Sequence, residues 1–379
     1  MFDSASGWIA AAIIGALTAC VAFVVDIATA TVSDWKLGYC TSNPLLSREA
    51  CCKGQTPFTG LISINQEVSD NCKDWHLWTN NYTSSFAIYV GFALAFGIIS
   101  GSVTMLTKRS LPATSPGTGD KNQHADAVQP AVAGKSMYMA AGSGIPEIKT
   151  ILSGFVIPNF LDLKVLVVKA IGATFAVSTG MCLGKEGPFV HISTCVGYLV
   201  ASHFPKYRDN GKKMRGELLE VNNRVQVLTP VIEILSAACA SGLSVAFGAP
   251  IGGVLFSYEE ISTYFPRKIL WRAFLCSLTA AMVLKELNPT GTGKLVLFET
   301  HYGTSYEPVH YLVFVALGVA GGIFGGIFCK ANYMWSKWFR SYSLIKKYPV
   351  FEVFLVVAAT ALLQYPNPCL LYTSPSPRD

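Results

Sequence analysis

Long, uninterrupted apolar blocks constrain this chain more than any other feature. Residues 8–33 (WIAAAIIGALTACVAFVVDIATATVS) and 86–106 (FAIYVGFALAFGIISGSVTML) are each about as long as a helix that crosses a bilayer. Further apolar blocks follow near 164–183, 231–262, 273–284, 309–329 and 350–363. Only 14% of the residues are charged, against about a quarter in soluble domains. The sequence therefore predicts a polytopic protein whose main partner is the lipid bilayer.

The net charge of +6 is unevenly distributed. Basic residues cluster beside the apolar blocks, at Lys108 and Arg109 and within 206–215, 267–272 and 337–347. Such clusters are typical of cytoplasmic loops. No basic domain with interleaved aromatic residues accompanies them, so nucleic acid is not an expected partner.

The polar connection 34–83 is expected on the opposite, lumenal or extracellular side. It contains a glycosylation sequon at Asn81 and an even set of cysteines: Cys40, Cys51, Cys52 and Cys72. These features predict an oxidising compartment, one or two disulfides and a glycan. The alternative is a set of free thiols and an unused sequon.

The chain divides into segments of different character. Residues 1–107 hold the first two transmembrane helices and the loop 34–83, and residues 108–140, rich in Pro, Gly, Ser and Ala, predict a flexible cytoplasmic loop. Within 141–285 the apolar segments are short and cut by Gly and Pro, which is typical of broken helices that line a transport site. Residues 286–365 contain a Gly- and Ala-rich span resembling the first one, so they are expected to begin a second repeat. The Ser- and Pro-rich tail 366–379 is expected to be non-native.

Three stretches in the middle segment share one pattern of small residues, a proline and an apolar helix. They are GSGIPEI (142–148), GKEGPFV (184–190) and GAPIGGV (248–254), which begin with Gly142, Gly184 and Gly248. Glycine permits unusual backbone angles, and proline suits a first helical turn. The unpaired amides at such helix starts carry the positive end of the helix dipole. If the three starts converge within the membrane, they form a binding site for a dehydrated anion.

Three carboxylates in or near these stretches are candidates for a role: Glu186 at the start of the second helix, and Glu259 and Glu260 at the end of the third. Glu186 lies at the start of the second helix, where amides favour its ionised form and burial favours protonation. It is a candidate gate that competes with the anion, although Lys185 and Glu186 could instead form a structural pair at an interfacial turn. Glu259 and Glu260 are adjacent on a helix and face different surroundings, so one is a candidate proton carrier. The alternative is that both are solvated at a helix end.

Enzyme motifs fail on inspection. GSGIPE lacks the third glycine of a dinucleotide fingerprint, and NPTGTGKL lacks two required positions of a phosphate loop. No nucleophile–base set and no metal-ligand spacing is recognisable. An enzyme, a catalytic residue, a metal site and a bound cofactor are therefore not expected.

The Thr229–Pro230 pair predicts the start of a further helix, with Thr229 as its N-cap and Pro230 in its first position.

The three motifs, in this order, resemble the CLC family of chloride channels and chloride/proton antiporters. The longer strings GSGIPEIKTILSGF and LSVAFGAPIGGVLFSYEE are similar to its eukaryotic endosomal branch. The resemblance covers roughly residues 7–365. It implies an all-α integral membrane protein with an inverted-repeat architecture of tilted and broken helices, of which the second half is largely missing here.

The resemblance also implies roles for individual residues. Ser143 is expected at the central chloride site, Glu186 as the gating glutamate and Glu260 as the internal proton-transfer glutamate. The neighbouring residues at the two helix starts complete the expected chloride-binding set: Gly144, Ile145, Gly187 and Pro188. The implied activity is chloride/proton exchange by a homodimer in an endosomal, Golgi or vacuolar membrane. The alternatives are a passive voltage-gated chloride channel and a truncated fragment that does not transport.

Overall fold

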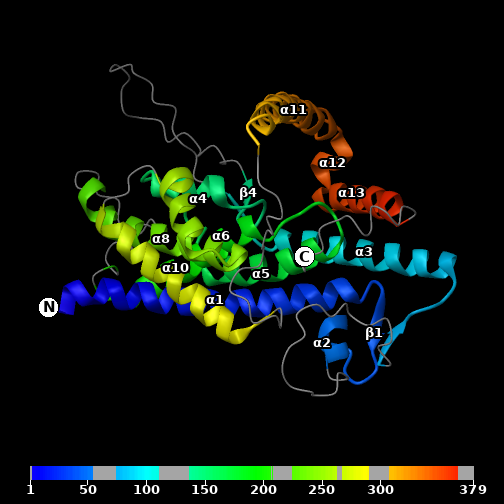
Figure 1. The fold of residues 1–379 in the computed structure, drawn as a ribbon, viewed down its shortest axis with the longest axis horizontal. Coiled ribbons are helices and arrows are strands. Elements are labelled where there is room, and N and C mark those ends of the chain that lie inside the picture. The colour runs from blue at the N-terminus through cyan, green and yellow to red at the C-terminus, as the bar shows by residue number, and fades with distance from the viewer. Residues whose placement is uncertain are drawn as a thin grey trace, which may run out of the picture.

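The described part of the chain folds into a bundle of helices with two small two-stranded sheets (Figure 1). The computed structural model describes residues 2–53, 74–110, 136–205, 207, 224–262, 267–289 and 307–365. The elements of the first part are α1 (Phe2–Asp34), β1 (Gly38–Cys40), α2 (Arg48–Lys53), β2 (Trp75–Leu77), α3 (Tyr82–Met105), β3 (Lys108–Ser110), β4 (Ser136–Tyr138), α4 (Ile145–Leu152), α5 (Leu163–Ser178) and α6 (Glu186–Ala201). Those of the second part are α8 (Arg224–Phe247), α9 (Pro250–Phe256), the π-helix η1 (Ser257–Ile261), α10 (Arg267–Leu287), α11 (His310–Phe339), α12 (Ser343–Lys347) and α13 (Pro349–Gln364).

Small residues bring the central helices close together. α1 packs along α10, and α8 packs on both α6 and α10. A side chain at Gly15 of α1 would collide with the backbone of Cys276 on α10, and one at Gly197 of α6 would lie 2.5 Å from Ala238 on α8. Close approach through Gly, Ala and Ser is typical of helix pairs in membranes, where packing rather than water drives association.

The predicted apolar blocks are helical in the structure. By length and composition, three described helices could cross a membrane: Ala5–Asp34, Tyr82–Met105 and His310–Phe339. The block 231–262 is broken, as its Gly and Pro residues predict, into the end of α8, then α9 and η1. The predicted helix start at Thr229 is wrong, because α8 already begins at Arg224 and takes Pro230 into its length.

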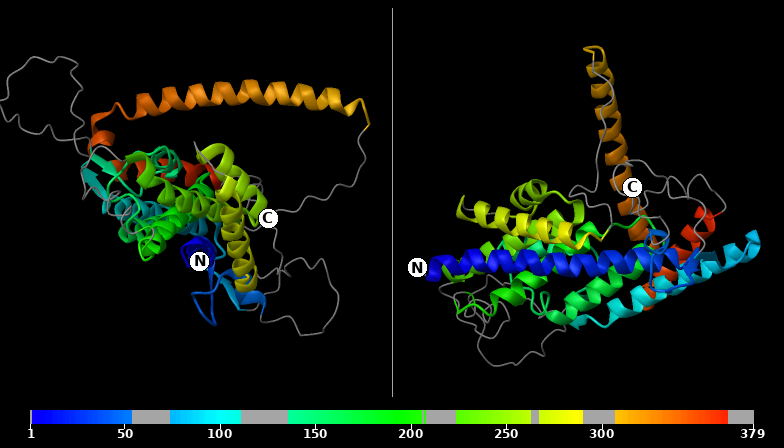
Figure 2. Two further views of the ribbon diagram at one scale, coloured as in Figure 1. Left: turned by 90° about the vertical axis from the view of Figure 1, so that its left-hand side faces the viewer. Right: turned by 60° about the horizontal axis from the view of Figure 1, so that its bottom comes forward.

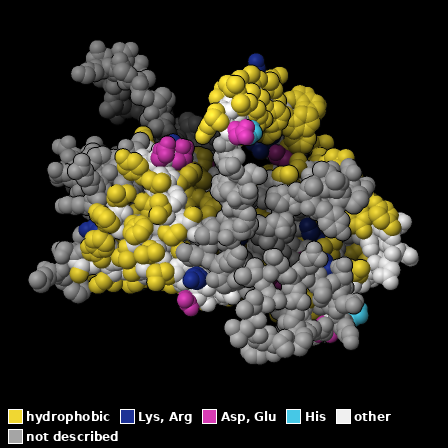
Figure 3. Space-filling view, viewed as in Figure 1, with side chains coloured by type: hydrophobic (Ala, Val, Ile, Leu, Met, Phe, Trp, Pro, Cys, Tyr) yellow, Lys and Arg dark blue, Asp and Glu magenta, His cyan; other side chains and the backbone are white. Residues whose placement is uncertain are grey.

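Apolar side chains cover much of the outside of the bundle (Figure 3). α1 alone exposes Trp8, Ile9, Ile13, Leu17 and Val24. α11 lies apart from the bundle (Figure 2), and none of its residues is buried against the rest of the described chain. Exposed apolar surface on this scale fits a protein whose solvent is lipid.

The strands lie in two connections between helices, one between α1 and α3 and the other between α3 and α4. In the loop 34–83, β1 pairs with β2, and α2 contacts both strands. The ends of the predicted flexible segment 108–140 pair with each other as β3 and β4, and its residues 111–135 lie outside the described chain. The predicted tail 366–379 also lies outside it.

Candidate anion site

The first motif forms the N-terminus of the short helix α4. Gly142 and Gly144 have positive φ angles of 66° and 85°, in the left-handed region that favours glycine. Gly144 precedes the helix, and Pro146 occupies its first turn. The Ser143 hydroxyl accepts a hydrogen bond of 3.3 Å from the Ile145 amide, which leaves the hydroxyl proton free to donate outward. This end of α4 therefore presents hydrogen-bond donors.

The second motif starts α6 beside this helix end. Glu186 is the first residue of α6, and Pro188 follows in its first turn. A Cβ atom at Gly187 would lie only 2.7 Å from the Cβ atom of Ser143. Gly187 thus lets the starts of α4 and α6 touch, and the structure brings together the first two stretches that the sequence predicts as a site.

The Glu186 side chain lies close over the backbone of its own motif. It is half-buried, and its Oε2 atom occupies the space that a side chain at Gly184 would need. Gly184 is therefore required for this placement of the carboxylate. The carboxylate sits at the first residue of α6, the positive end of the helix dipole.

Lys185 does not pair with its neighbour in the chain. Its Nζ atom lies 2.8 Å from Oδ1 of Asp26 on α1, and the two side chains are only 18% and 11% exposed. The ammonium also lies 5.8 Å from the centre of the Phe189 ring. The alternative of a structural Lys185–Glu186 pair is therefore wrong, and the partner of Lys185 comes from a distant helix.

The third motif lies in a different setting. It starts α9 after Gly248, whose φ is 66°, and α9 packs on α8 and α10. A side chain at Gly253 would collide with the backbone of α8, so this glycine serves helix packing. The expected contact between helix starts is therefore observed for the first two motifs, and the place of Gly248 in the anion site stays a prediction.

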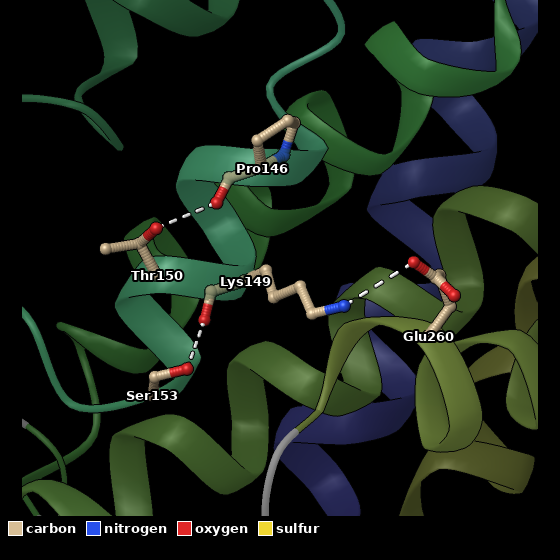
Figure 4. Close-up of polar contacts among 5 residues, drawn as sticks. All are labelled: Pro146, Lys149, Thr150, Ser153 and Glu260. Atoms are coloured by element: carbon tan, nitrogen blue, oxygen red, sulfur yellow. Dashed lines mark hydrogen bonds and ion pairs between the residues drawn. The ribbon is translucent and has the colours of Figure 1, made fainter. Parts of the chain in front are cut away.

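Glu260 lies near the C-terminal end of α4 (Figure 4). Its Oε1 atom is 3.5 Å from Nζ of Lys149 on α4, and both side chains are at least half exposed. The hydroxyls of Thr150 and Ser153 donate to the carbonyls of Pro146 and Lys149 and so secure the helix that carries the lysine. One end of α4 therefore belongs to the candidate anion site, and the other end contacts the predicted proton carrier.

The loop 34–83 contains a disulfide, as its cysteines predict. Cys40 and Cys51 form a disulfide, Cys52 is also disulfide-bonded, and Cys72 lies outside the described residues. Asn81 is exposed just before α3, where a glycan would find room. Its glycosylation stays a prediction.

Sequence reasoning missed two buried residues behind the first motif. The Lys169 ammonium on α5 donates to backbone carbonyls of residues 140–142. His191 on α6 is fully buried, stacks on Phe160 and shares a hydrogen bond of 3.1 Å with its carbonyl. A Cβ atom at Gly144 would lie 2.6 Å from His191 Nδ1. For Lys169 the sequence did carry a signal, because a single lysine inside a predicted apolar span marks a candidate functional residue. The same signal was available for Asp26, the partner of Lys185.

Known proteins match both the sequence and the fold. The family model described as voltage gated chloride channel matches residues 127–375. Human H(+)/Cl(-) exchange transporter 3 is 38% identical over 378 residues, covering 97% of this chain and 40% of the human protein. Guinea pig (Cavia porcellus) H(+)/Cl(-) exchange transporter 5 is 38% identical over 375 residues, covering 96% and 43%. The chain thus spans less than half the length of these relatives.

Two solved structures share the fold at low sequence identity. A eukaryotic CLC transporter superposes with a TM-score of 0.59 at 22% identity, covering 95% of this chain and 49% of that one. A slow cyanobacterial Cl-/H+ antiporter superposes with a TM-score of 0.57 at 16% identity, covering 98% and 64%. With the family model matching most of its length, this chain belongs to the voltage-gated chloride channel (CLC) family.

Proposed function

We propose that this chain is part of a chloride/proton exchanger of an intracellular membrane. The observation that carries the proposal is the contact between Ser143 and Gly187, which joins the starts of α4 and α6 with Glu186 beside them. The names of the relatives that match nearly all of the chain support exchange over passive conduction. Those relatives are more than twice as long, so the activity of the whole protein is part of the proposal.

In the proposed mechanism, chloride binds where the two helix starts meet. The Ser143 hydroxyl and the amides of Gly144 and Gly187 are suitable donors, because each lies at a helix start and the helix dipoles favour a negative charge there. No metal or cofactor is needed for this step, since backbone donors supply the stabilisation. Chloride and the Glu186 carboxylate are both anions, so they compete for the same donors.

The proton is proposed to reach this region from the other end of α4. Glu260 is exposed and can exchange protons with solvent, and its contact with Lys149 holds it against α4, the helix that begins two residues after Ser143. When Glu186 takes a proton it loses its charge and leaves the donors to chloride. This alternation links each proton to the movement of anions.

The test is transport by the purified 379-residue chain in liposomes. Under a chloride gradient we expect proton movement that stops when chloride is removed. In the Glu186→Ala variant we expect chloride flux without proton movement. We expect the Glu260→Ala variant also to keep chloride flux and to lose proton movement. Glu259→Ala is the matched control, because Glu259 is the exposed neighbour of Glu260.

Each other outcome has a definite meaning. Chloride flux without proton movement in the parent protein would replace the exchanger with a passive channel. Unchanged coupling after Glu186→Ala would remove Glu186 from its role. No flux at all would favour a fragment that does not transport. The proposed homodimer is tested separately by cross-linking in membranes.

A further inference from the structure

Lys169 is a buried cation directly behind the first motif. It lies on α5 and is 3% exposed. Its Nζ atom lies 2.9 Å from the carbonyl oxygen of Ala140 and 3.5 Å from that of Ala141, and it also donates to the carbonyl of Gly142. An ammonium has three donors, so three acceptors satisfy its charged form completely. The three carbonyls therefore stabilise the ammonium form of Lys169 at this buried position.

These three bonds also fix the direction of the peptide groups. In a trans peptide the N–H points away from the C=O, so the amides of Gly142 and Ser143 face away from Lys169. The positive φ angles of Gly142 and Gly144 flank Ser143, whose φ is not positive. Left-handed residues on both sides of Ser143 turn the backbone sharply here, and successive amides in such turns bind anions.

We propose that Lys169 is a positioning residue that also supplies charge to the anion site. It binds the carbonyls of residues 140–142, which turns the amides of Gly142 and Ser143 away from it, and its charge attracts a monovalent anion bound at those two amides. This inference rests on the proposed function, because it concerns the same site. The ammonium and the anion are separated by about the length of two residues. At an effective dielectric constant of about 20, their Coulomb interaction changes the anion affinity by on the order of tenfold or more.

One nearby carboxylate opposes this attraction. Glu147, in the first turn of α4, interacts electrostatically with Lys169 and is half-buried. It makes no direct ion pair with Lys169 among the described contacts, so it weakens the field of the ammonium without cancelling it. The competing account is that Lys169 only braces the loop and that its charge has no effect on the anion.

The experiment titrates chloride and bromide into the purified chain in detergent by calorimetry. Lys169→Gln keeps two donors and removes the charge, whereas Lys169→Arg keeps both. Lys164→Gln is the matched control, because Lys164 is exposed in the first turn of the same helix. Thermal unfolding establishes that each variant is folded.

We expect Lys169→Gln to weaken chloride and bromide binding by the same factor, about tenfold or more, because a Coulomb interaction depends only on the charge of the anion. Lys169→Arg and Lys164→Gln should stay within about threefold of the parent. The same factor for both anions is the signature that a merely structural role would not give, since a displaced loop changes the fit of the two ions differently.

The opposite results are equally clear. A folded Lys169→Gln variant with unchanged affinity, or with a changed preference between the two halides, overturns the charge role. If Lys169→Gln does not fold, Lys169→Arg decides, and a tenfold loss of affinity there overturns the inference. A parent chain that binds neither halide overturns this inference together with the proposed anion site.

Discussion

Replacing Gly187 with alanine should push apart the two helix starts that form the candidate anion site. The added Cβ would lie 2.7 Å from the Cβ and 3.3 Å from the Cα of Ser143. Carbon atoms in contact prefer about 3.5–4.0 Å, so the backbones must separate by about 1 Å. The Cα and Cβ atoms of Ser143 have positions fixed by the backbone, so neither can rotate away from the added methyl group.

The expected effects on stability and on transport differ in size. Alanine is favoured over glycine within a helix by about 0.5–1 kcal/mol, while overpacking costs about 1–3 kcal/mol. The net loss of stability should therefore stay below about 2.5 kcal/mol. A displacement of about 1 Å in a binding site can reduce rates by about a hundredfold. We expect transport to suffer far more than folding.

The assay compares chloride flux in liposomes with thermal unfolding in detergent. Gly172→Ala on α5 is the control, because its Cβ would meet the Thr104 hydroxyl at 3.6 Å, an ordinary contact. We expect flux of the Gly172→Ala variant to match the parent. If Gly187→Ala transports as well as Gly172→Ala, the contact between the helix starts does not determine transport, and the reasoning fails.

Two further predictions concern charged side chains. Lys185→Met and Asp26→Asn should each lower the stability by about 2–3 kcal/mol, because each leaves a partly buried charge without its partner. The double variant should lose clearly less than the sum in thermal unfolding, and strictly additive losses would contradict the pair. Burial lowers the pKa of Lys36, just after α1, to about 8 from 10.5, against the opposing charge of Asp34. The folded protein then releases a proton that the unfolded chain keeps, so stability should rise by up to ~3 kcal/mol between pH 8 and 10.5. Lys36→Met should flatten this rise in unfolding measurements, and an identical pH profile in the variant would count against it.

Local chemistry explains which features the sequence could predict. Gly142 and Gly144 needed left-handed angles, and Pro146, Pro188 and Pro250 each lie in the first turn of a helix, as their motifs predict. Such features depend on a few neighbouring residues, so they can be read from a short string. The Thr229–Pro230 signal was equally local and failed, because α8 already begins at Arg224 and includes the proline.

Long-range partners could not be read in this way. Asp26 and Lys185 are 159 residues apart, and Lys149 and Glu260 are 111 residues apart. Each residue alone looked like an isolated charge, and only the packing of α1 and η1 supplies its partner.

The distance between Asp26 and Lys185 along the chain has a consequence for biosynthesis. The ribosome adds about 5–20 residues per second, so roughly ten to thirty seconds separate the two side chains. During that time α1 must enter the bilayer with a carboxyl group whose insertion costs up to ~3 kcal/mol at the centre of a span. Until α6 has been made, Asp26 therefore has no Lys185 to pair with, and α1 enters the membrane with the cost of an unpaired carboxyl group.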